Sequence, residues 1–132
     1  MPPPPNPAPG TAPEWLDRAR GKLALARQPL PPGAFYEDLC FLTQQAAELA
    51  IKAVYQLHGW LFPFVHNLGT LLDGLENQGL SIPPEVQDAD QLSIYAVQAR
   101  YPGLPNPTTR DEYEGSLRTA EAVLAWAESF VP

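Results

Sequence analysis

Several residue types are scarce in this sequence, and each shortage excludes a class of protein. Cys40 is the one cysteine, so the chain forms no internal disulfide, which fits a reducing compartment. Lys and Arg number 8 against 15 Asp and Glu, and the net charge of −7 argues against a surface for non-specific nucleic-acid binding. No apolar run is long enough to span a membrane, and no secretory signal is recognisable. We therefore expect a cytoplasmic protein without a membrane partner.

Proline, in contrast, is abundant, but its 17 copies are clustered. Residues 1–13 (MPPPPNPAPGTAP) are expected to be a disordered, proline-rich leader of polyproline II character. This leader is interpreted as a plain flexible segment, with a ligand for a proline-recognising module as the alternative. Residues 14–132 have the size of one domain.

The remaining prolines separate five apolar segments with helical periodicity, and none of these segments qualifies as a strand. Thr11 with Glu14, and Thr109 with Glu112, have the spacing of helix capping boxes, and Asn67 is a good N-cap. The predicted helices cover about 14–28, 34–58, 67–79, 83–101 and 109–127. We therefore expect an all-α, up-and-down bundle of four main helices plus a short extra helix.

The first predicted helix differs from the rest of the chain in charge. Residues 14–28 carry four basic and two acidic side chains, a local charge of +2, whereas the remainder carries four basic and thirteen acidic side chains. A basic helix lying against an acidic body explains this, with self-complementary docking of two copies as the alternative.

The predicted helix 34–58 is apolar on more than one side. Its main apolar stripe begins at Phe35 and continues at intervals of three and four residues. Phe41, Ile51 and Tyr55 lie roughly on the opposite side. These three residues are therefore predicted to form a homodimer interface, unless the N-terminal helix and the loops of the same chain cover that side.

A narrow polar stripe separates the two apolar sides. It consists of Gln45, Glu48 and Lys52, and Glu48 four residues before Lys52 is the favourable order for an ion pair within a helix. Such stripes are usually solvated, and the functional alternative is one wall of a cleft for a nucleotide or a protein partner. Spacing alone does not choose between the two.

Several short motifs follow one another in a distinctive order: Trp15, Phe35-Tyr36, the segment FLTQQAAELAIKA beginning at Phe41, His66-Asn67-Leu68, and Ala99-Arg100-Tyr101-Pro102. This order resembles that of the prokaryotic HEPN domain family, and the resemblance covers residues 14–130. The resemblance implies a compact helical bundle, commonly a homodimer, that associates with small nucleotidyltransferases, as in toxin–antitoxin systems. It also implies a role in binding nucleotides or RNA.

One departure from the family concerns catalysis. HEPN ribonucleases carry an arginine followed after four to six residues by a histidine, and no arginine of this sequence has such a histidine. The resemblance therefore does not imply RNA cleavage. Arg100 with Tyr101 is the best candidate for anion contact, because a guanidinium can hold a phosphate and a tyrosine can stack on a base. The alternative for Arg100 is pairing at the end of its helix.

The other reactive side chains give no enzyme motif. His66 is interpreted as a loop donor to the end of helix 34–58 or to Glu48, and Cys40 as a small buried residue. No metal-ligand spacing and no phosphate-binding glycine motif is present, so no metal or cofactor is expected.

Taken together, these features predict a non-catalytic HEPN-type module that dimerises and binds a nucleotide or a small nucleotidyltransferase partner. Gln45, Glu48, Lys52, His66, Arg100 and Tyr101 are its predicted recognition residues. The alternatives are a metal-independent ribonuclease toxin with a non-standard active site, such as His66 with Arg100, and a structural dimer or antitoxin partner without a ligand.

Overall fold

The computed structural model describes residues 10–98 and 107–132, and every regular element in these ranges is helical. The elements are α1 (Ala12–Ala26), α2 (Tyr36–Leu57), α3 (Leu68–Asn77), α4 (Pro84–Gln87), the 3₁₀ helix η1 (Asp88–Ile94), α5 (Tyr95–Gln98) and α6 (Arg110–Glu128). The all-α prediction is confirmed. None of the helices in the described ranges is both long enough and apolar enough to cross a membrane.

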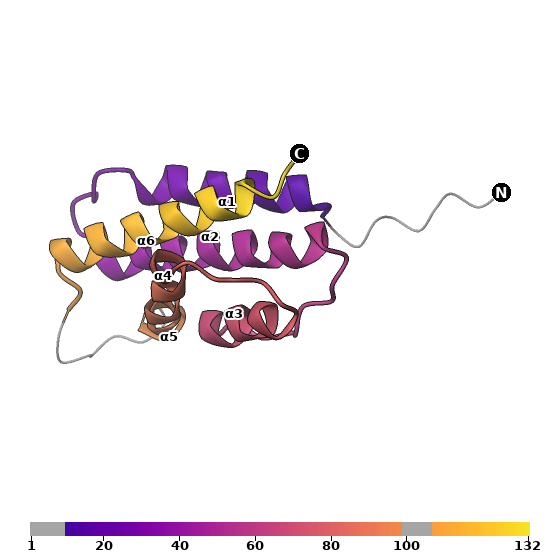
Figure 1. Cartoon of the computed structure of the whole chain (residues 1–132). Coiled ribbons are helices and arrows are strands. Elements are labelled where there is room, and N and C mark those ends of the chain that lie inside the picture. The colour runs from indigo at the N-terminus through magenta and orange to yellow at the C-terminus, as the bar shows by residue number, and fades with distance from the viewer. Residues whose placement is uncertain (1–9, 99–106) are drawn as a thin grey trace.

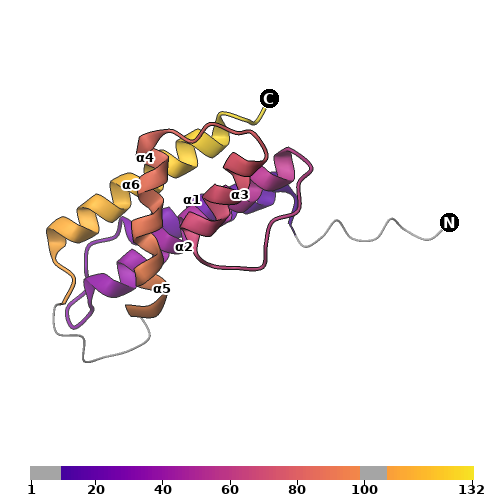
Figure 2. The same cartoon turned by 60° about the horizontal axis from the view of Figure 1, so that its bottom comes forward.

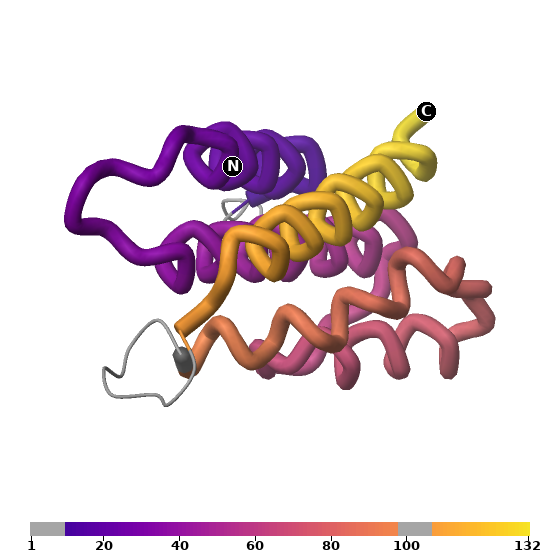
Figure 3. Tube along the Cα trace, turned by 90° about the vertical axis from the view of Figure 1, so that its left-hand side faces the viewer, coloured from indigo at the N-terminus to yellow at the C-terminus, as the bar shows by residue number. Residues whose placement is uncertain are grey.

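Helix α2 is the central element of the bundle. Helices α1 and α6 lie on one side of α2, and α3 and the segment from α4 to α5 lie on the other (Figures 1 and 3). That segment crosses the molecule, because α4 contacts α6 and α5 contacts α2 (Figure 2). The core between these elements is apolar and includes Leu16, Leu23, Ile51, Val54, Leu71, Leu75 and Val123.

Three helices begin at the caps that the sequence predicts. Thr109 and Glu112 form a complete capping box, with bonds of 3.1 Å from Glu112 N to Thr109 Oγ1 and 3.0 Å from Thr109 N to Glu112 Oε1. Asn67 caps α3 by accepting from Thr70 N at 2.9 Å. Thr11 accepts from Glu14 N at 3.4 Å, one of the two bonds of a capping box. Since α1 begins at Ala12, the last residues assigned to the leader belong to the helical domain.

The fourth predicted helix differs from the expectation, because it is divided into α4, η1 and α5. Its buried side chains are spaced three residues apart: Val86, Ala89, Leu92 and Tyr95. A 3₁₀ helix has 3.0 residues per turn, so η1 places Ala89 and Leu92 on one side, and Val86 of α4 and Tyr95 of α5 continue the same spacing. Ile94 and Val97, whose spacing would also suit the apolar side of a continuous α-helix, are more than half exposed.

The basic side chains of α1 form ion pairs with acidic side chains of the same chain. Arg20 contacts Glu128 at 3.1 Å and Arg27 contacts Glu121 at 3.4 Å, so the basic helix lies against the acidic α6. All four side chains are at least two-fifths exposed. Solvent therefore screens these pairs, and they orient α1 more than they stabilise it.

A buried tyrosine holds α3 against α2. The Tyr55 hydroxyl donates a hydrogen bond of 2.6 Å to the backbone oxygen of Leu71 in α3. Gly74, one turn further along α3, leaves the space that this hydroxyl occupies, since a Cβ at Gly74 would lie 2.1 Å from the Tyr55 oxygen. The close approach of the two helices depends on a glycine at this position.

Candidate functional site

One strip of α2 remains accessible. Between Leu39 and Tyr55, the partly exposed residues are Phe41, Leu42, Gln45, Glu48 and Leu49, and every other residue is buried. At about 100° per residue these five side chains occupy roughly a third of the helix circumference. We refer to them as the α2 strip. It combines three apolar side chains with one amide and one carboxylate.

Glu48 is the centre of a polar cluster on this strip. Its carboxylate accepts from Gln44 Nε2 at 3.1 Å, contacts Lys52 Nζ at 3.1 Å, and contacts His66 Nδ1 at 3.0 Å. The structure thus brings together Glu48, Lys52 and His66 of the predicted recognition residues. Gln45 lies on the strip three residues before Glu48.

The charge of Lys52 is compensated inside this cluster. Its side chain is 9% exposed, its ammonium group is paired with Glu48, and the same group lies 5.0 Å from the centre of the Phe62 ring. Desolvated ion pairs are stable when further contacts satisfy both charges, as the ring and the neighbouring donors do here. An anionic ligand would have to compete with Glu48 for this lysine.

His66 reaches the cluster from the segment that precedes α3. It stands immediately before the Asn67 cap, and the residue after that cap is also anchored, because Leu68 N donates to Ser93 Oγ at 2.9 Å. Since a carboxylate can only accept, the bond to Glu48 places the imidazole hydrogen on Nδ1. The ring is 78% exposed, so a partner outside the cluster can reach it.

Two of the three residues predicted at a dimer interface are inside the monomer. Ile51 is fully buried and Tyr55 is 2% exposed, in the same core as residues of α3. Tyr55 contacts Leu71 of α3 and the Phe62 ring, so α3 and the loop before it cover this residue; the loops were part of the open alternative, and α3 was not. Phe41 alone of the three remains partly exposed, and it lies on the α2 strip.

Two predicted residues are not described by the structure, and two residues of the cluster were not predicted. Arg100 and Tyr101 lie outside the described residues. Gln44 and Phe62 were not predicted as contributors, although Gln44 precedes Glu48 by the four residues that permit a contact within a helix. Phe62 has no comparable local pattern, because a loop places its ring under Lys52.

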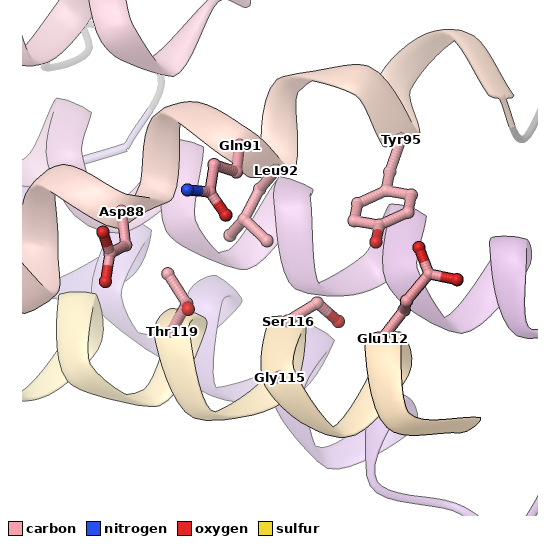
Figure 4. A pocket seen from close by; sticks show the side chains of 8 residues that line it. All are labelled: Asp88, Gln91, Leu92, Tyr95, Glu112, Gly115, Ser116 and Thr119. Carbon is pink, nitrogen blue, oxygen red and sulfur yellow. The ribbon is translucent and has the colours of Figure 1, made fainter. Parts of the chain in front are cut away.

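A separate pocket of about 330 Å³ lies between η1, α5 and α6. Its lining consists of Asp88, Gln91, Leu92, Tyr95, Glu112, Gly115, Ser116 and Thr119 (Figure 4). Tyr95 and Glu112 approach each other at one end, and Asp88 faces Thr119 at the other (Figure 4). The lining has two carboxylates and no basic side chain, so its electrostatics oppose a phosphate or another anion.

The thiol and the phenol beside this pocket are not activated. Burial raises the pKa of the Cys40 thiol, which accepts a hydrogen bond of 3.4 Å from Ser116 Oγ. Burial, together with the neighbouring Cys40 and Glu112, raises the pKa of Tyr95 to about 12. Both groups are protonated at neutral pH, so neither supplies the anion that a nucleophile needs. Within the described residues, no group of three or more His, Cys, Asp and Glu side chains could hold a metal ion.

Comparison with known proteins shows the family. The HEPN domain model matches residues 12–130, and the chain belongs to the HEPN domain family. The crystal structure of TT1696 from Thermus thermophilus is similar at 32% identity, with a TM-score of 0.79 over 91% of this chain and 98% of that chain. ST0689, an archaeal HEPN homologue, is similar at 26% identity, with a TM-score of 0.70 over 91% of this chain and 97% of that chain. Among curated proteins there is no match.

Proposed function

We propose that this HEPN domain is a non-catalytic cytoplasmic module of a toxin–antitoxin-like system. It pairs with a second copy through the α2 strip, and it binds a nucleotide or a small nucleotidyltransferase partner beside that strip. Glu48 and His66 would provide the polar contacts, together with Arg100 and Tyr101 from outside the described residues. The observation that supports this proposal is the strip itself, the one accessible sector in the middle of an otherwise buried central helix.

The composition of the α2 strip suits contact with another protein chain. Phe41, Leu42 and Leu49 offer apolar surface, while Gln45 and Glu48 lie among them. Interfaces between proteins combine apolar contact area with polar groups that fix the register. A second copy would bring the same strip, so two copies related by twofold symmetry could bury the three apolar side chains against each other.

The charges near the strip favour a protein partner over an isolated phosphate group. Lys52 is paired with Glu48, the pocket beside α6 is acidic, and the chain has a net charge of −7. A partner with basic side chains would meet a complementary surface, whereas a phosphate would find its cation in Arg100 rather than in this cluster. The charges described here therefore support the protein partner more directly than they support the nucleotide.

The dimer is tested by placing a charge on the strip. Phe41→Asp is expected to lower the molar mass in solution from twice the chain mass of 14.5 kDa to once that mass, because an aspartate would be desolvated at the interface. Light scattering after size-exclusion chromatography measures this change. Leu25→Asp is the matched control, since Leu25 is 55% exposed and belongs to α1 and not to the strip. A monomeric wild-type protein, or a dimeric Phe41→Asp protein, would contradict the proposal.

The ligand is tested by calorimetric titration of the purified protein with nucleoside triphosphates. Binding that is weakened at least tenfold by Arg100→Ala, and also by His66→Ala, is the result expected for nucleotide recognition beside the strip. Arg110→Ala is the matched control, because Arg110 is an exposed arginine paired locally with Glu114. The absence of heat with every nucleotide would remove the nucleotide half and leave only the partner half.

A further inference from the structure

The loop between α2 and α3 exposes apolar side chains on an anchored backbone. Trp60, Phe62 and Val65 pack against the core, whereas Leu61 is 95% exposed and Phe64 is 97% exposed. Large apolar side chains presented in this way are typical of surfaces that another segment covers.

Three aromatic rings on this surface are linked in series through Phe62. The centre of the Phe62 ring lies 5.3 Å from that of Trp15 in α1 and 6.1 Å from that of Phe64. Lys52 contributes no uncompensated charge beside the row, because its ammonium group is paired with Glu48. We refer to Trp15, Phe62, Phe64 and the adjacent Leu61 as the aromatic row.

The chain enters the described structure at the Trp15 end of this row. Gly10 has φ +96°, and a Cβ at this position would lie 1.9 Å from the indole nitrogen of Trp15. Its backbone oxygen accepts from Gln56 Nε2 at 3.2 Å, which anchors the residue to α2. Gly10, the first described residue, therefore lies beside the first ring of the row.

We propose that the aromatic row is the binding site of the proline-rich residues 1–9 of the same chain. Six of these nine residues are proline, and proline-rich segments bind surfaces lined by aromatic rings, because their extended form loses little conformational entropy. At about 3.1 Å per residue, four residues in this form span about 12 Å, which is comparable to the two ring-to-ring steps of the row. The covalent connection at Gly10 gives residues 1–9 a high effective concentration at this site.

The two non-proline residues inside the segment provide the test. Asn6 and Ala8 have backbone amides, so the heteronuclear ¹⁵N NOE reports how strongly each is ordered in the full chain. We expect NOE values close to those of the helices in the wild-type protein. Phe64→Ala should reduce both values at least twofold, because it removes the outermost ring of the row. Phe35→Ala is the matched control, since Phe35 is an exposed phenylalanine before α2 and should leave both values unchanged.

Deletion of residues 1–9 gives a second readout that does not depend on ordering of the segment. It should shift the ring and amide resonances of Phe64, and a synthetic peptide of residues 1–9 should restore part of that shift. Wild-type NOE values as low as those of a free peptide, with unchanged Phe64 resonances after deletion, would overturn the proposal. A loss of the NOE on dilution would also overturn it, because the occupant would then be the segment of a second copy.

Discussion

Gly74→Ala is expected to destabilise the fold by about 2 kcal/mol, although alanine is the better helix former by about 1 kcal/mol. The new Cβ would lie 2.1 Å from the Tyr55 hydroxyl oxygen, a distance that real atoms do not reach. The tyrosine is 2% exposed and its hydroxyl donates to Leu71, so it can move only by opening the contact between α2 and α3. The destabilisation from overpacking a closed core is larger than the stabilisation from the higher helix propensity of alanine.

Two further comparisons separate this explanation from a general effect of replacing a helical glycine by alanine. Gly21→Ala, on the exposed side of α1, places its Cβ where no atom lies within 4 Å, so it should stabilise the protein by about 0.5–1 kcal/mol. In a Tyr55→Phe background the obstructing oxygen is absent, and Gly74→Ala should then cost less than about 1 kcal/mol. Urea unfolding of the wild type, Gly74→Ala, Tyr55→Phe and the double variant gives the coupling free energy. Equal effects of Gly74→Ala with and without the Tyr55 hydroxyl would contradict the explanation.

The sequence predicts the long helices well, because the residues that cap and define a helix are close to one another in the chain. Thr109 and Glu112, or Asn67 alone, define a helix start through residues at most three positions apart, and the structure shows these caps. The division of residues 84–98 was missed for a different reason. Val86, Ala89, Leu92 and Tyr95 have the spacing of a 3₁₀ helix, but Ile94 and Val97 also suit an α-helix, and only packing against α2 and α6 decides between them.

In the candidate site, too, some contacts follow from local spacing, whereas others depend on how distant segments pack. The contact between Glu48 and Lys52 follows from their spacing on one helix, and the contact between His66 and Glu48 is one of the two that the sequence suggests for this histidine. The burial of Ile51 and Tyr55 could not be predicted, because an apolar helix surface does not identify the chain that covers it. The position of Phe62 depends on a loop, for which periodicity provides no information.

Glu48→Ala is expected to destabilise the protein by about 3 kcal/mol, and Lys52→Met by about 1 kcal/mol or less. The asymmetry arises from the partners that each side chain keeps. Without Lys52, the Glu48 carboxylate still accepts from Gln44 and His66. Without Glu48, the Lys52 ammonium retains the face of the Phe62 ring, while its side chain is 9% exposed. A charge that is buried without a counterion costs far more than a missing bond at a surface.

The double variant distinguishes an unpaired charge from a simple loss of packing. Methionine preserves most of the volume of the lysine stem, so Lys52→Met should recover about 2 kcal/mol in the Glu48→Ala protein by removing the stranded charge. If the two single effects merely add, the ion pair contributes little to the stability of α2. Equal costs of the two single variants would show that Gln44 and His66 do not compensate the carboxylate. Chemical unfolding of the four proteins at low and high salt measures these differences, and the coupling should persist at high salt because the pair is shielded from solvent.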